Sequence, residues 1–159
     1  MFLKKLSLAL GLAVTLFSSQ AQSQEVVWNS GEVELSKVYY FSGSSSSRYI
    51  GGFVSVQNIA YAKDVTAFLI DNDNGNLIAT VPAQFIAADP ENTGVEIWEF
   101  RTRNLISSSI ADFNARIYVT YSVAGSTFGD SNSGADYDVL EIGIPGPRFT
   151  GTLESFLNL

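Results

Sequence analysis

Residues 50–70 read IGGFVSVQNIAYAKDVTAFLI, two runs in which apolar and polar residues alternate on either side of a short interruption. Successive side chains of a β-strand point to opposite faces, so a period of two indicates a half-buried strand. The pattern predicts two strands, over residues 50–58 and 63–70. The apolar residues that recur at every second position are Val54, Val56, Val65, Ala67 and Leu69.

The same pattern continues in both directions from this stretch. Short runs rich in Val, Ile, Phe, Tyr and Thr are separated by clusters of Gly, Ser, Asn and Asp, which favour turns. Further strands are predicted over residues 32–41, 77–85, 95–103, 113–123, 127–128 and 137–144, with turns or loops at 43–47, 71–76 and 89–92. Seven or eight short strands at this spacing predict an all-β fold, an antiparallel β-sandwich, although the periodicity does not give the strand order.

Residues 1–21 have the features of a secretory signal peptide. Two lysines precede a largely apolar run, and Ser19 and Ala21 place small residues at the positions that a signal peptidase reads. The same pattern allows cleavage after Ser23 instead. A membrane anchor is the alternative, but a span needs about 20 apolar residues. We therefore expect a secreted or periplasmic protein with no membrane span after signal cleavage.

The chain that remains after cleavage suits one domain. Residues 22–47 are expected to hold the first strand and a Ser-rich turn of the sandwich, and residues 48–144 its main part. Residues 145–159 differ, because the Pro-Gly-Pro sequence from Pro145 is expected to break any strand. This tail could form a short helix, pair as an extra strand or fray. Packing on its own domain is favoured over docking on a partner.

Charge and composition exclude several classes of function. The 159 residues carry a formal charge of −7, and loss of residues 1–21 leaves seven basic against 16 acidic residues, or −9. Such a chain repels phosphate backbones and anionic membranes, so nucleic acid is not an expected partner. Cysteine and histidine are absent. Their absence excludes disulfides, Ser-His-Asp catalysis and Cys-His catalysis, and removes most transition-metal sites, so no metal or other cofactor is expected.

Two patterns in the sequence suggest a metal-binding or a catalytic role, and each has a plainer explanation. The run DNDNGN at 71–76 resembles a calcium loop, but an EF-hand needs Gly at position six and Glu at position twelve, where Gly75 is fifth and Pro82 twelfth. A hairpin turn is favoured, because Asn-Gly between strands is a strong turn signal. A glycosidase needs two facing carboxylates, whereas Glu96 and Glu99 are three apart on a strand and point to opposite faces. The sequence therefore predicts no enzyme.

Three motifs resemble those of the starch-binding domains of carbohydrate-binding module family 21. Residues 54–65 are similar to its first hallmark, a strand that ends in V-x-N-x-A-[YF]-x-K-x-V. Residues 121–137, YSVAGSTFGDSNSGADY, are similar to its second hallmark, Y-x-V-x-G-x-x-[YF]-[WY]-D-N-N-x-x-x-N-Y, and residues 98–100 match W-x-F. The motifs occur in order over about residues 48–140. The resemblance implies an immunoglobulin-like sandwich that binds sugar through aromatic side chains.

One binding site of that family uses the asparagine, tyrosine and lysine of the first hallmark. All three are present here, as Asn58, Tyr61 and Lys63. Aromatic rings stack on the apolar faces of a sugar while polar side chains reach its hydroxyls. Judged as residues alone, Asn58 could equally be a turn former. A sugar platform is favoured for Tyr61 over a half-buried strand residue, and an ordinary edge-strand or surface charge is favoured for Lys63. Our sequence-based hypothesis is that this site carries binding and that Tyr61→Ala would abolish retention on starch.

The other family site uses a loop tryptophan, a strand tyrosine and the second aromatic of the second hallmark. Here the loop at 71–76 has no aromatic, Tyr118 matches the strand tyrosine, and Gly129 stands where the second aromatic is expected. The sequence therefore predicts a degraded site and little effect of Tyr118→Ala. Further candidate residues in the second hallmark are Phe128, Asp130, Asn132, Asp136 and Tyr137, although Tyr137 could equally close the core.

The resemblance implies non-catalytic binding of an α-glucan such as starch, glycogen or a maltooligosaccharide. A secreted amylolytic enzyme is the partner protein that it suggests. Two alternatives stay open. One is an exported structural or adhesive sandwich that has lost sugar binding, which Gly129 and the short 71–76 loop favour. The other is a scaffold that brings a phosphatase to glycogen, which the expected export disfavours.

Overall fold

A computed structural model describes residues 25–42, 48–102, 113–145 and 153–157. The predicted signal peptide, residues 1–21, and the predicted turn at 43–47 lie outside the described residues. Export of the chain therefore stays a prediction. None of the helices in the described part of the chain is long and apolar enough to cross a membrane.

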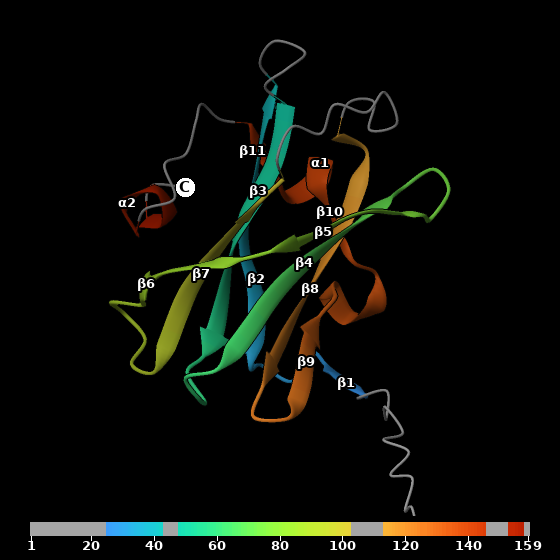
Figure 1. The fold of residues 1–159 in the computed structure, drawn as a ribbon. Helices are drawn as coiled ribbons and strands as arrows, with labels where there is room; N and C mark the ends of the chain where they lie inside the picture. The colour runs from blue at the N-terminus through green and yellow to red at the C-terminus, as the bar shows by residue number, and fades with distance from the viewer. Residues whose placement is uncertain (1–24, 43–47, 103–112, 146–152, 158–159) are drawn as a thin grey trace, which may run out of the picture.

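The described chain is a β-sandwich of two sheets (Figure 1). The first sheet has the order β1-β9-β8-β4-β5, with β10 also paired to β8, and the second has the order β11-β2-β3-β7-β6. The strands are β1 Val26–Trp28, β2 Val33–Ser42, β3 Arg48–Gln57, β4 Lys63–Asp71, β5 Leu77–Pro82, β6 Gln84–Ala88, β7 Val95–Arg101, β8 Ala115–Val123, β9 Ser126–Asp130, β10 Tyr137–Asp138 and β11 Ile144–Pro145. The helices are α1 Val139–Ile142, α2 Leu153–Leu157 and a 3-10 turn at Asn132–Gly134.

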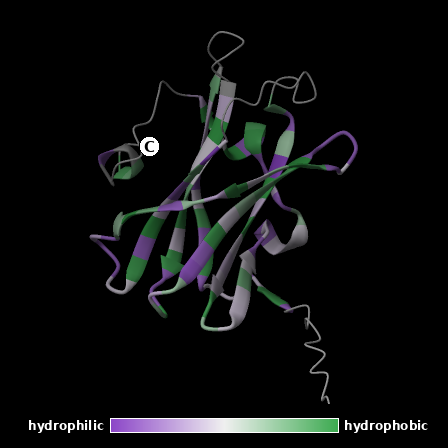
Figure 2. Cartoon of the chain, in the orientation of Figure 1, coloured by the Kyte–Doolittle hydropathy of each residue, from purple (hydrophilic) through white to green (hydrophobic). Residues whose placement is uncertain are grey.

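The core forms between the two sheets from the alternating strands. In β4 and β8 every second side chain is buried, and Figure 2 shows apolar and polar residues following one another along β7. The five apolar positions within residues 50–70 are confirmed as core, each at most 2% exposed. Burial of one such valine or leucine stabilises the fold by about 1.5–3 kcal/mol. Trp98 and Phe100 of β7 also face this core, as expected for alternate residues of one strand.

The strand predicted over 77–85 is two strands in different sheets. β5 pairs with β4 of the first sheet, and β6 pairs with β7 of the second. The chain crosses between the sheets at Ala83, whose N–H donates to Val65 O (2.8 Å). Pro82 ends β5 because proline has no N–H to continue the ladder. The prediction of a single strand over 77–85 was therefore wrong. That run of sequence instead supplies β5 at the edge of the first sheet and the start of β6 at the edge of the second.

The prediction of one strand over 137–144 was also wrong. β10 is extended at the start of this range and Ile144 of β11 at its end, but α1 lies between them and begins directly after β10. Asp138 starts the helix, because its Oδ1 accepts hydrogen bonds from the N–H groups of Leu140 (2.9 Å) and Glu141 (3.3 Å). Pro145, expected to break any strand, instead lies in β11, which pairs with β2 at the sheet edge where proline is tolerated.

Two pairings make the sheets mixed instead of purely antiparallel. β1 pairs parallel with β9, and β11 pairs parallel with β2. Both are short edge strands, three and two residues long. β1 was not predicted as a strand, because so short a run has no measurable period. The described residues contain eleven strands, where seven or eight were expected.

The predicted turn at 71–76 is confirmed as the hairpin between β4 and β5. The carboxylate of Asp71 accepts hydrogen bonds from the N–H of Asp73 (2.8 Å) and the side-chain amide of Asn74 (3.1 Å). Gly75 takes a φ of 73°, which a side chain would disfavour. Within the described residues no three acidic side chains gather in a way that suits a metal ion.

The C-terminal helix covers the outer face of the second sheet. Tyr39, Phe53 and Ile97 form a fully buried cluster there, and Phe156 of α2 packs against it. The rings of Phe53 and Phe156 meet edge to face at 5.4 Å, and the Lys37 ammonium donates to the carbonyl oxygen of Phe156. A five-residue helix would not persist alone, so this contact holds it in place.

Candidate functional site

The two groups of predicted site residues lie at separate places on the sandwich. Asn58, Tyr61 and Lys63 belong to the β3–β4 loop and the start of β4. Tyr118 lies on β8, opposite Phe68 of β4. Lys63 and Phe68 are five residues apart on β4, which corresponds to about 17 Å of strand. The chain therefore presents two distinct candidate surfaces.

The lysine of the first group is tied into the protein. Lys63 Nζ donates to Asn58 Oδ1 (2.6 Å) and forms an ion pair with Glu96 Oε2 (2.9 Å), and only 4% of its side chain is exposed. Glu96 Oε2 also accepts from Trp98 Nε1 (3.1 Å). The interpretation of Lys63 as an ordinary surface charge was therefore wrong. Its ammonium fixes both ends of the loop that carries Tyr61.

Tyr61 itself is fully exposed at the tip of that loop. The loop is held at its base, where the N–H of Asn58 donates to Gly94 O (2.8 Å) and the Tyr121 hydroxyl donates to Gln57 O (2.6 Å). The half-buried interpretation of Tyr61 was wrong. The loop thus presents an exposed ring beside an open hollow of about 650 Å³, which Ala60, Ala62 and Lys63 line together with the turn between β8 and β9.

Three candidates of the second group serve the fold. Asp130 is 7% exposed, and its carboxylate accepts hydrogen bonds from the N–H of Leu35 (2.8 Å) and the hydroxyl of Tyr137 (3.0 Å). Burial and the neighbouring Asp130 charge raise the pKa of Tyr137. Phe128 packs inward beside Tyr121, with ring centroids 6.1 Å apart. Asp130 thus connects β9 to β2 and to Tyr137 of β10, and Phe128 belongs to the packing around the core.

Tyr118 and Asp136 lie together in an open hollow of about 580 Å³, referred to below as the Trp28 pocket. Its lining combines aromatic carbon with small polar groups from β1, β8 and the loop between β9 and β10. The lining residues are Trp28, Asn29, Tyr118, Ser131, Ser133, Gly134 and Asp136. Asn132 belongs to the same loop, and its amide donates to Asp136 O (3.3 Å). The structure thus brings three predicted residues to one place, together with a tryptophan that the sequence did not predict.

Trp28 fills the space above Gly129. The two residues pair in register between β1 and β9. A Cβ atom placed on Gly129 would lie 2.5 Å from Cε3 and Cζ3 of the Trp28 ring, closer than real Cβ contacts come. The indole therefore covers the position from which a side chain at 129 would project.

Tyr118 stands between two other aromatic rings. The Phe68 ring is stacked against it with centroids 4.7 Å apart and 7° between the planes. The Trp28 ring meets it edge to face, at 5.7 Å and 71°. Aromatic pairs of this kind contribute about 0.5–1.5 kcal/mol each beyond the area they bury. The three rings form a continuous aromatic band across the outer face of the first sheet.

The polar side of the pocket is a tightly turned loop. Asn132, Ser133 and Asp136 have left-handed φ angles of 47°, 58° and 57°. The N–H groups of Gly134 and Asp136 both donate to Ser131 O (2.9 Å each). Non-glycine residues in this region are strained by about 1–3 kcal/mol each, and such residues cluster at functional sites.

Asp136 supplies the charge of the pocket. Burial raises the pKa of its carboxyl, an effect that the Arg116 guanidinium 3.8 Å away partly offsets. Burial and the Asp136 charge also raise the pKa of Tyr118, so its hydroxyl stays protonated at neutral pH. The pocket therefore holds one anionic acceptor, Asp136, and a neutral phenol hydroxyl, that of Tyr118, beside an aromatic ring.

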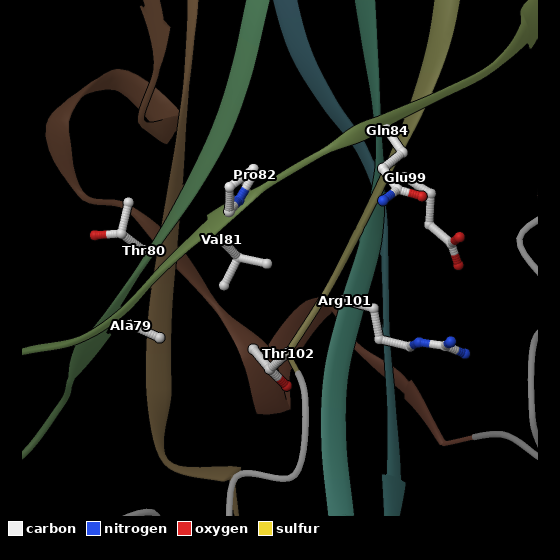
Figure 3. A pocket seen from close by; sticks show the side chains of 8 residues that line it. All are labelled: Ala79, Thr80, Val81, Pro82, Gln84, Glu99, Arg101 and Thr102. Atoms are coloured by element: carbon white, nitrogen blue, oxygen red, sulfur yellow. The ribbon is translucent and has the colours of Figure 1, made fainter.

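A second hollow, of about 540 Å³, lies where β5 crosses toward β6 (Figure 3). Among the described residues that line it, Glu99 is the one acid. Its carboxylate accepts a hydrogen bond from the Tyr39 hydroxyl. Figure 3 shows Glu99 and Arg101 directed to the same side, away from Pro82 and Thr80 of β5. Glu96 lies on the other face of β7, beside Lys63, as expected for residues three apart. No facing pair of carboxylates lines this hollow.

The sequence analysis missed Trp28 and its neighbour Asn29. The N–H of Asn29 donates to Gly129 O (2.6 Å), and its Oδ1 accepts from the N–H of Ser131 (3.1 Å). β1 therefore bonds to β9 and to the pocket loop at once. This pairing joins residues about a hundred positions apart, and no local pattern in the sequence reports it.

Comparison with known proteins places most of the chain in a family. The model of the carbohydrate/starch-binding module (family 21) matches residues 28–140. Glucoamylase 1 of Rhizopus oryzae is 34% identical over 116 residues, which is 70% of this chain. The matched region is 17% of the glucoamylase, so the chain spans a small part of that enzyme's length.

Two solved structures are similar as well. The starch-binding domain of Rhizopus oryzae glucoamylase, solved in complex with β-cyclodextrin and maltoheptaose, is 30% identical, with a TM-score of 0.48, over 70% of this chain and 94% of that chain. The carbohydrate-binding module of the muscle glycogen-targeting subunit of protein phosphatase-1 is 21% identical, with a TM-score of 0.46, over 67% of this chain and 73% of that chain.

Proposed function

The chain belongs to family 21 of the carbohydrate/starch-binding modules, and on that basis we propose that it binds an α-glucan without catalysis, at the Trp28 pocket. The observation that carries the proposal is the pocket's mixed lining, in which aromatic rings and hydroxyl-binding groups meet on an open surface. A glucose ring has apolar C–H faces and a polar rim, so it needs both kinds of partner.

Different residues of the pocket suit the apolar face and the polar rim of a sugar ring. The aromatic band offers carbon surface for the face of a sugar ring. Asp136 offers an anionic acceptor for sugar hydroxyls, and the Tyr118 hydroxyl is both donor and acceptor. An open site of this size contacts few sugar units, so each site binds weakly and retention depends on several contacts along one glucan.

Retention on an insoluble polysaccharide tests the proposal. We expect the purified protein to be retained on starch, to pass through cellulose, and to be released from starch by soluble maltoheptaose. The similar glucoamylase domain was solved with that sugar, which makes it the natural probe. Equal retention on both polysaccharides, or none at high protein concentration, would contradict the proposal and favour an exported structural or adhesive sandwich.

The pH dependence of binding is expected to follow Asp136. Because burial raises the pKa of this carboxyl, it takes up a proton above the ordinary aspartate value of 3.8. Protonation removes the anionic acceptor and the ion pair with Arg116. Affinity for maltoheptaose should therefore fall on acidification, starting above pH 3.8. The stability of the fold depends on pH in the opposite direction. Because the pKa of Asp136 is raised in the folded state, its contribution to stability is present below the unfolded-state pKa and is lost as the pH rises through the folded-state pKa.

Asp136→Asn is the matched variant for this pH test. Asparagine tolerates the left-handed φ of 57° as well as aspartate does, so the loop is expected to stay folded. The variant should bind more weakly at neutral pH and lose the change in affinity with pH, as measured by isothermal titration calorimetry. An unchanged pH profile in the variant would show that another group titrates.

The proposal also includes where the chain binds the glucan and which protein it acts with. The charged, apolar and small-residue pattern of residues 1–21 supports export. Similarity to a glucoamylase domain supports a secreted amylolytic enzyme as the partner that benefits from the bound glucan. The phosphatase-scaffold alternative requires a cytoplasmic location, which the signal pattern disfavours.

A further inference from the structure

We infer that Trp28 supplies, from β1, the sugar-stacking ring that the family pattern places at position 129 on β9. The inference rests on the proposed function, because it names the platform of the same pocket. It concerns a residue outside both hallmarks, on a strand of three residues. It also reverses the expectation that Gly129 leaves this site degraded.

The first step is that the Trp28 ring occupies the space that a side chain at position 129 would need. Trp28 and Gly129 are register partners on adjacent strands. Gly129 does not adopt a left-handed φ, so its backbone would accept another residue. What forbids a side chain there is first the indole, 2.5 Å from the place of its Cβ atom, and then Cγ1 of Val26, at 2.9 Å. An aromatic residue at 129 and the present position of Trp28 therefore exclude each other.

The second step is the exposure of the indole. Trp28 is 45% exposed, whereas Trp98 packs against the core and its Nε1 donates to Glu96. The Trp28 ring contacts Tyr118 on one side and lines the pocket with its remaining surface. A half-exposed tryptophan in a pocket with polar groups has the amphipathic character of a binding platform.

The third step is how firmly the ring is held. Asn29 follows Trp28 and bonds to β9 and to the pocket loop at 2.6 and 3.1 Å. These bonds fix the end of β1 from which the indole projects. The platform is therefore preorganised, which reduces the entropy lost when a sugar binds.

Four variants test the inference, with affinity for maltoheptaose as the readout. Trp28→Ala should weaken binding at least tenfold. Trp28→Leu keeps an apolar cover over Gly129 without a flat ring, and should lose as much. Gly129→Tyr alone should weaken binding, because two rings compete for one space. Trp28→Ala combined with Gly129→Tyr should recover most of the lost affinity, because the ring returns from β9.

A matched control is Phe85→Ala, which removes an aromatic that is 53% exposed, against 45% for Trp28, from β6 of the other sheet and should bind like the parent protein. Near-parental binding by Trp28→Ala and Trp28→Leu would overturn the inference. So would a double variant that folds, by circular dichroism, yet binds no better than Trp28→Ala. Failure of the parent protein to bind any maltooligosaccharide would instead refute the proposed function, which keeps the two outcomes apart.

Discussion

Replacing Tyr118 with alanine is expected to lower the affinity for maltoheptaose by about 30-fold. The substitution removes the ring that stands between Phe68 and Trp28, together with the hydroxyl beside Asp136. Loss of one aromatic contact and one hydrogen bond costs about 1–3 kcal/mol, and about 2 kcal/mol, the middle of this range, is about 30-fold in affinity. Titration calorimetry on the folded variant measures the change.

Tyr118→Phe and Tyr61→Ala resolve this effect into its parts. The phenylalanine variant keeps the aromatic band and should lose only the share of affinity that the hydroxyl contributes. Tyr61→Ala removes a fully exposed ring outside the pocket and should cost less than Tyr118→Ala. The sequence-based hypothesis expects the reverse order. A larger loss in Tyr61→Ala would place the main site on the β3–β4 loop and contradict the pocket.

Replacing Asp130 with alanine is expected to lower the free energy of unfolding by about 3 kcal/mol. The carboxylate is buried, and it accepts hydrogen bonds from the Leu35 N–H and the Tyr137 hydroxyl. The Leu35 N–H lies at a bulge in β2 and relies on this side chain. Each buried polar group left without a partner costs about 1–3 kcal/mol. Urea unfolding followed by circular dichroism gives the difference.

Asp64→Ala is the control for that measurement. Asp64 is exposed on β4, and truncation of an exposed side chain changes stability by about 0.5 kcal/mol or less. Both variants lose one negative charge, so a general effect of net charge would destabilise or stabilise them equally. Equal midpoints for the two variants would show that the Asp130 network contributes nothing specific.

The long strands could be predicted because their information is local. Alternation of buried and half-buried residues in β4 and β8 follows from the two-residue period of a strand, and it is confirmed. In β3 residues 50–54 are all buried, because Phe156 of α2 packs against Phe53 on the outer face. The errors occur where a single residue overrides the pattern. Pro82 divides one apolar run between two sheets, and Asp138 begins a helix inside another.

The candidate site was only partly predictable for a related reason. Tyr118 and Asp136 could be found because they fall in or beside a recognisable motif. The roles of Lys63 and Asp130 could not, since a buried ion pair and a buried hydrogen bond depend on partners 33 and 95 residues away. Trp28 belongs to no motif and pairs with β9 across the chain. Only the register of β1 brings it over Gly129.

The pairing of Trp28 with Gly129 has a wider consequence for binding sites on sheets. Neighbouring strands lie about 4.8 Å apart, so a large ring on one strand reaches the surface above a glycine on the next. A platform can therefore move between strands while the surface stays similar. Motif comparison, which follows one position at a time, interprets such a site as lost.

The most direct test of glucan binding at the Trp28 pocket follows the two indole N–H signals in a ¹⁵N-correlated NMR spectrum. The chain has two tryptophans, and Trp28→Phe identifies which signal belongs to the pocket. During a maltoheptaose titration we expect the Trp28 signal to move saturably, while the Trp98 signal, held by Glu96, stays in place. A stationary Trp28 signal at sugar concentrations that saturate binding would contradict the account.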